Sequence, residues 1–256
     1  MVDSMRRRGA ALLVAAALTR VEAAALRDRA PGGAARWERS NYAGRRVELY
    51  AGPAAALGAA GGMTLLPARQ RAAAGIAVLA AGACGVYDDL AGAKDTRRGF
   101  RAHLGALRGG EVTSGAVKLV GVSAAGLAAG ALLKERPVDK VLAGVVIAGS
   151  AHLVNLVDVR PARAAATVLA MGSVGLFRSG PGGIVAAASM GAAAAVLPDD
   201  LGERAMIGDA GAHALGAAIG TAVAAGNGRA GLVAHAVALV AAAARGDRIS
   251  RAVAGD

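Results

Sequence analysis

The sequence predicts an all-α fold, a polytopic transmembrane bundle of about nine spans (8–10) in a single domain over residues 1–256. Hydrophobic residues make up 55% of the chain, aromatic residues only 2%, and the mean hydropathy is +0.47. Apolar runs of about 16 to 20 residues recur from end to end, as expected where helices cross roughly 30 Å of hydrocarbon. The runs lack the alternation and aromatic girdles of a barrel, and the 38 glycines favour close helix packing.

The first predicted span is the least regular. Arg20 and Glu22 interrupt it, and each costs about 2.5 to 3.5 kcal/mol at mid-bilayer unless it is paired or snorkels. The arginines at 6–8 before a short apolar core also resemble a signal peptide, so the sequence leaves open whether 9–26 spans. The next two spans are more uniform, and the single cysteine within them excludes a disulfide framework and a Cys-rich metal site. These three spans are 9–26, 48–65 and 72–87.

Six further runs of Ala, Gly, Val and Leu follow, separated by short segments that carry Pro, Gly or charged residues. Lys118 lies near the end of one run, where it either snorkels or contacts phosphate. His235 lies inside another and is interpreted as a core residue. The predicted spans are 115–133, 139–157, 164–177, 182–197, 210–225 and 228–244.

The distribution of positive charge predicts the orientation. Of the 29 Lys and Arg residues, 17 fall on one side if alternate connections share that side, and the positive-inside rule makes it cytoplasmic. The composition favours a bacterial plasma membrane, although the N-terminal arginines then lie on the outer side. The net charge of +11 indicates topology and attraction to anionic lipid and phosphate rather than nucleic acid. The connections concerned are 27–46, 88–114, 158–163, 198–209 and the tail after 244.

Acidic residues cluster at that face. Asp88 and Asp89 end an apolar run, where adjacent carboxylates could hold Mg²⁺, with Mn²⁺ as a substitute, while Lys94 and Arg101 contact phosphate. Taken alone, such a pair is more often a solvated turn at a helix end.

Two more polar motifs follow on the same face. Asn155 and Asp158 are three residues apart and lie on one helical face, as a ligand site or as a polar cap. Asp209 precedes an apolar helix as a ligand or an N-cap, and Gly208 and Gly211 would let a backbone or a diphosphate approach closely.

Together these motifs resemble the polyprenyl-phosphate N-acetylhexosamine-1-phosphate transferase superfamily of glycosyltransferase family 4 type, as a short divergent member. It includes phospho-N-acetylmuramoyl-pentapeptide transferase and the GlcNAc-1-phosphate transferases. The Asp-Asp, Asn-x-x-Asp and Gly-Asp-x-Gly motifs match in order at the positions above, over roughly residues 40–245. The polar loop that begins at Asn41 resembles the family's first loop.

The resemblance implies transfer of a sugar-1-phosphate from a UDP-N-acetyl amino sugar to a polyprenyl phosphate, with release of UMP, in envelope polysaccharide or peptidoglycan synthesis. It implies that Asp209 binds Mg²⁺, with Asp88 as a second ligand. One of Asp88 and Asp89 would position or deprotonate the lipid phosphate, and Asn155 with Asp158 would hold the nucleotide end. A homodimer is left open.

The chain departs from the family pattern in two places. Asp158 is followed by Val159-Arg160-Pro161, so that Pro161 holds the position of the family's second acid; either a nucleotide contact is lost there, or a rearranged loop contacts phosphate through Arg160. The late His-rich loop is also missing. Two alternatives therefore remain: a non-catalytic homologue that binds polyprenyl phosphate or regulates an envelope-synthesis partner, and a transporter, which the lack of ionisable residues at mid-membrane disfavours.

Overall fold

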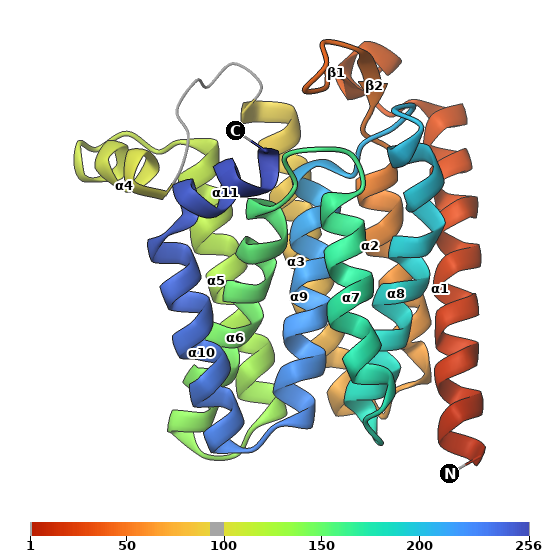
Figure 1. Cartoon of the computed structure of the whole chain (residues 1–256), viewed down its shortest axis with the longest axis vertical. Coiled ribbons are helices and arrows are strands. Elements are labelled where there is room, and N and C mark those ends of the chain that lie inside the picture. Colours follow the sequence, from red (N-terminus) through yellow and green to blue (C-terminus); the bar gives the residue numbers. More distant parts are fainter. Residues whose placement is uncertain (1, 93–99, 256) are drawn as a thin grey trace.

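The computed structural model describes residues 2–92 and 100–255, apart from the side chains of Val2, Phe100, Arg101 and Leu104. Each of the nine predicted runs forms a helix, so the all-α class is confirmed, and several of the helices could cross a membrane (Figure 1). These helices are α1 (Val2–Arg29), α2 (Ala51–Gly62), α3 (Ala68–Ala91), α5 (Ser114–Leu133), α6 (Pro137–Leu156), α7 (Arg163–Leu176), α8 (Pro181–Leu201), α9 (Gly208–Gly226) and α10 (Arg229–Ala244).

The shorter elements lie in the connections. The strands β1 (Glu38–Ser40) and β2 (Arg46–Glu48) form an antiparallel hairpin in which Arg39 pairs with Val47. Two further helices are α4 (Phe100–Arg108) and α11 (Gly246–Ala254), and two 3₁₀ segments are η1 (Ala34–Trp37) and η2 (Met63–Leu65).

The predicted count of about nine spans is not supported. Among the described residues, five helices are long and apolar enough to cross a membrane: α1, α3, α5, α6 and α8. The count rises to six if α10 and α11, which meet at a 76° bend, form one broken span. At 1.5 Å per residue, the 12 residues of α2 and the 14 of α7 fall well short of 30 Å.

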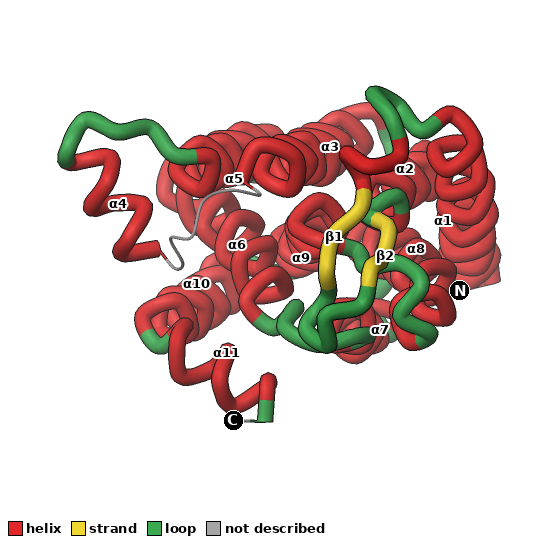
Figure 2. Tube along the Cα trace, turned by 90° about the horizontal axis from the view of Figure 1, so that it is seen from above, coloured by secondary structure: helices red, strands yellow, loops and turns green. Residues whose placement is uncertain are grey.

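Helix α9 lies at the centre of the bundle, with α3, α6 and α8 around it (Figure 2). Most of its residues are buried, and about two thirds of them are Gly or Ala, which allow close packing on several sides. Gly216 and Gly220 allow a close approach to α6, because a methyl group on either would lie 2.6 Å from a backbone atom of that helix. Small residues therefore bring α9 into contact with several neighbours at once.

The outer surface of the bundle is apolar. Large exposed hydrophobic side chains lie along the outer helices, among them Leu13 and Val21 of α1 and Val237 of α10. Arg20 of α1, which interrupts the first predicted span, pairs with Asp199 at 2.9 Å. This ion pair lowers the free-energy cost of placing Arg20 inside a membrane span.

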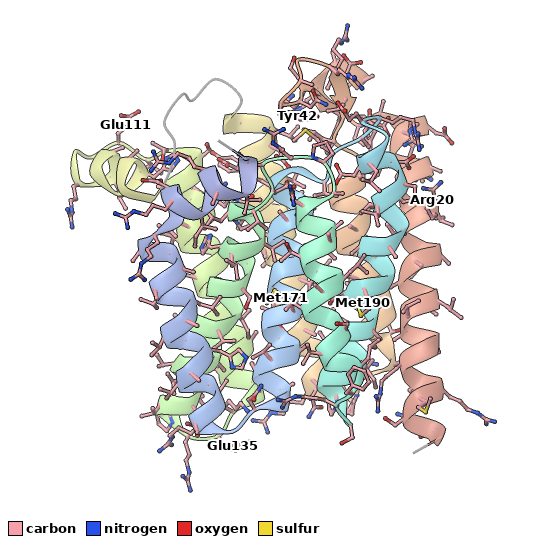
Figure 3. All side chains as sticks on the ribbon, in the orientation of Figure 1. Arg20, Tyr42, Glu111, Glu135, Met171 and Met190 are labelled. Carbon is pink, nitrogen blue, oxygen red and sulfur yellow. The ribbon has the colours of Figure 1, made fainter. Side chains whose placement is uncertain are left out.

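The described parts of the connections predicted to share one side do lie at one end of the bundle (Figure 1). The β-hairpin, the α6–α7 and α8–α9 connections, α4 and α11 are all at the upper end in that view, and the N-terminus is at the lower end. Figure 3 places Tyr42 at the upper end and Glu135 at the lower one. We call the upper end the acidic end, after Asp88, Asp158 and Asp209.

Candidate functional site

Two predicted acids meet at one lysine. Lys118 Nζ of α5 donates to Asp88 Oδ2 of α3 at 2.6 Å and to Asp209 Oδ2 of α9 at 2.5 Å. The three side chains are only 14%, 16% and 24% exposed, respectively, so the charges interact with little solvent screening. Two carboxylates that are 121 residues apart in the sequence thus contact the same ammonium group.

Asp89 plays a different part from its neighbour. Its carboxylate accepts hydrogen bonds from the backbone N–H groups of Asp209 and Ala210, both at 3.0 Å, and so caps the start of α9 from another helix. The cap of α9 is therefore Asp89 and not Asp209, whose carboxylate faces Lys118 instead. Arg39 of the hairpin donates to the backbone carbonyl of Asp89 and fixes this turn from above.

Glycines bring α3 and α9 close enough for this contact. A methyl group on Gly85 would lie 2.5 Å from both N and Cα of Ala210. Gly208 has a φ of +54°, a conformation that favours glycine, and turns the chain into α9 beside the Asp89 carboxylate. Gly211 lies against the Cα of Gly52 in α2. The group that approaches this glycine closely is therefore the backbone of α2.

We call Asp88, Asp209 and Lys118 the acid cluster. A pocket of about 150 Å³ opens beside it, between the β-hairpin, the α6–α7 connection and the end of α8. Its lining includes Asn41, Tyr42, Asp158, Arg160 and Pro161. The Arg160 guanidinium lies over the Tyr42 ring, 5.3 Å from its centroid. The pocket thus combines an aromatic face, a cation, an amide and a carboxyl group.

The walls of this pocket are tied together. Asn41 Nδ2 donates to Glu203 Oε2 at 2.7 Å, and Arg45 also pairs with Glu203. Buried Asp200 accepts from the N–H of Ala162 at 2.9 Å, which holds Ala162 at a φ of +66° and sets the path of the Pro161 turn. The pairing of Asn41 with Glu203 links the predicted first loop to the α8–α9 connection.

Asp158 connects the pocket to the acid cluster electrostatically. Burial, together with the negative charges of Asp200, Asp209 and Asp89, raises the pKa of the Asp158 carboxyl well above its ordinary value. These acids therefore form one region of negative potential at the acidic end. Asn155 lies one turn earlier at the end of α6 and is half-buried. Lys94 lies outside the described residues, as does the side chain of Arg101.

Three features were not assigned from the sequence. Lys118 was left between snorkelling and phosphate contact, and its pairing across three helices becomes visible only in the fold. The imidazoles of His152 and His213 meet edge to face with centroids 5.4 Å apart, and both Nε2 atoms are buried without a hydrogen-bond partner. Glu203 anchors the hairpin. The spacing of His213 four residues after Asp209 indicates a shared helical face.

The acid cluster offers two oxygens to one cation. Asp88 Oδ2 and Asp209 Oδ2 both lie within hydrogen-bond distance of the same ammonium nitrogen, so a single positive centre already sits between them. Hard carboxylate oxygens suit Mg²⁺, which commonly takes one or two carboxylates and completes its shell with water and phosphate. Within residues 2–92 and 100–255 no group of three or more His, Cys, Asp or Glu side chains is arranged to hold a metal alone.

No protein-family model matches this chain, and no curated protein matches it in sequence. The transferase resemblance accordingly rests on the three sequence motifs alone.

Proposed function

We propose that the protein is a Mg²⁺-dependent membrane transferase that moves a sugar-1-phosphate from a UDP-N-acetyl amino sugar to a polyprenyl phosphate and releases UMP. Its active face would be the acidic end, turned to the cytoplasm of a bacterial plasma membrane. The observation that carries the proposal is the convergence of Asp88 and Asp209 on Lys118. Each of the three motifs that resemble those of the family is weak evidence alone, but all three lie at the same end of the bundle.

The arrangement suits the electrostatics of the reaction. A lipid phosphate oxygen must bond to the phosphorus that carries the sugar, while the bond from that phosphorus to the bridging oxygen breaks and its electrons leave with UMP. Both reactants are anionic, so positive groups must screen them. Lys118 can turn from the carboxylates to a phosphate, and a bound Mg²⁺ held by Asp88 and Asp209 would supply further screening.

The pocket beside the cluster would take the nucleotide end of the donor. Tyr42 offers a ring face for a base, and Arg160 offers a cation for a phosphate oxygen. Arg160 and the Pro161 turn supply a cation at the place where the family pattern has a second acid. A phosphate would therefore be bound there directly by a guanidinium group.

Release of UMP from a panel of UDP-sugars, with polyprenyl phosphate and Mg²⁺, tests the proposal. We expect wild-type protein to release UMP and Asp209→Asn to do so at least about 100-fold more slowly, since one lost charge at the reacting centre costs several kcal/mol. Because this nearly isosteric change leaves the Asp89 cap of α9 in place, the melting temperature of the variant should equal that of wild type. Wild-type protein that binds polyprenyl phosphate without releasing UMP would identify a non-catalytic homologue.

A further inference from the structure

Helix α11 ends the chain in a position that the proposed reaction does not use. It leaves α10 at a bend of 76°, so it runs across the bundle axis at the acidic end (Figures 1 and 2). The helix before it carries an outward stripe of exposed valines, Val233, Val237 and Val240. In a membrane this stripe contacts acyl chains, and α11 begins one turn beyond it, at the level of the headgroups.

The two faces of α11 differ in character. Ile249, Ser250 and Val253 are half-buried against the bundle, and a methyl group on Gly246 would lie 3.5 Å from a Leu156 side-chain carbon at the end of α6. Arg248 and Arg251 are exposed on the opposite face. This separation of apolar and basic residues is typical of helices that lie in the membrane interface.

The arginines of this face have no acidic partner. Arg245 at the bend and Arg248 and Arg251 of α11 recur at every third residue, and none forms an ion pair with an Asp or Glu in the part of the chain that the structure describes. Other exposed arginines contrast with them: Arg229 is paired with Asp139, and Arg69 with Glu135. Among the described residues, these three cations at headgroup level therefore have no carboxylate bound to them, although α11 also carries the exposed Asp247.

We infer that the arginine face of α11 is a binding surface for anionic phospholipid headgroups. Charge complementarity selects the ligand, because three guanidinium groups can bind lipid phosphates through paired hydrogen bonds. The apolar face and the bend at Arg245 hold the helix in the interface, so binding needs no rearrangement of the bundle. The surface is separate from the acid cluster and stands whether or not the protein is a transferase.

Lipid-resolved quenching in vesicles tests this inference. A fluorophore is placed on Ala252→Cys, an exposed position beside the arginines, in a Cys84→Ala background. Full-length protein is reconstituted in phosphatidylcholine with roughly 30 mol% of lipid brominated as either phosphatidylglycerol or phosphatidylcholine. We expect quenching by brominated phosphatidylglycerol to be at least about twofold stronger, and the preference to shrink in about 0.5 M NaCl, where charges are screened.

Charge variants assign the preference to α11. Replacing Arg245, Arg248 and Arg251 together by Gln should abolish it, whereas replacing the three by Lys should largely keep it. A matched control replaces Arg71, Arg136 and Lys140, which lie at the other end of the bundle, by Gln; it should leave the preference intact. Equal quenching by the two brominated lipids, or a preference that survives in the Arg→Gln triple variant, would overturn the inference. So would displacement of phosphatidylglycerol by a trace of polyprenyl phosphate, which would make the face a substrate site.

Discussion

Lys118 is the residue on which the acidic end depends. Its ammonium group lies between two carboxylates that would otherwise repel each other across the α3–α9 contact. An ion pair in such a poorly solvated place contributes little net stability, but removing one partner leaves uncompensated charge. A divalent cation could therefore replace the lysine between the carboxylates, and a phosphate could then take their place as the partner of its ammonium group.

The variant Lys118→Met should show this role directly. We expect it to lose roughly 3 kcal/mol of stability in the absence of metal, because Asp88 and Asp209 are left facing each other. Added Mg²⁺ should raise the melting temperature of the variant more than that of wild type, since the cation can take the vacated place. Lys140→Met, at the other end of the bundle, is the control. A metal-indifferent Lys118→Met variant as stable as wild type would contradict the account.

Asp158 provides a pH-dependent readout of the acid-rich region. Its pKa is raised in the folded protein by burial and by neighbouring negative charge. The unfolded chain therefore loses this proton at a lower pH than the folded one, and stability falls as pH rises through that interval. We expect the melting temperature of wild type to fall more steeply than that of Asp158→Asn from about pH 4 upward, with the gap levelling off above the folded-state pKa. Parallel melting curves would show that Asp158 is not held in this environment.

At the scale of elements, the α3–α9 contact sets the geometry of the acids. Gly85 lets the two backbones touch where Asp89 caps α9. Gly85→Ala should destabilise the protein by about 1 to 3 kcal/mol, because α9 must move away from the cap. Gly75→Ala, on the same helix with nothing within 4 Å of the added methyl group, should instead stabilise it by about 0.5 to 1 kcal/mol. Equal melting temperatures for the two variants in detergent would contradict the close-contact account.

The helices were predictable from the sequence because each apolar run between Pro, Gly or charged residues had to bury its backbone polar groups in a helix. The number of membrane spans was not predictable, since the apolar runs at α2 and α7 form helices of only 12 and 14 residues. The hairpin 38–48 and α11 were left as loop and tail: three-residue strands and a nine-residue helix carry too little periodicity to be recognised.

At the scale of the whole molecule, the fold explains why the sequence motifs predicted the shared face of the acids but not the role of each one. Asp88, Asp89, Asp158 and Asp209 each lie at a helix end, and alternate helix ends share one side of a bundle, so their common face followed from topology. Their separate roles did not. Asp88 and Asp89 are adjacent, yet one faces Lys118 and the other faces the N-terminus of α9, because α9 begins directly beside α3 at Gly85.

The central claim is that Asp88 and Asp209 act as one unit on one phosphate and cation. A double-variant cycle on Mg²⁺-dependent UMP release measures this coupling. We predict that Asp88→Asn and Asp209→Asn each lower the rate at least about 100-fold, and that the double variant falls within about threefold of the worse single one. Losses that multiply in the double variant would mean that the two acids act independently, and undiminished release by either single variant would remove that acid from the site.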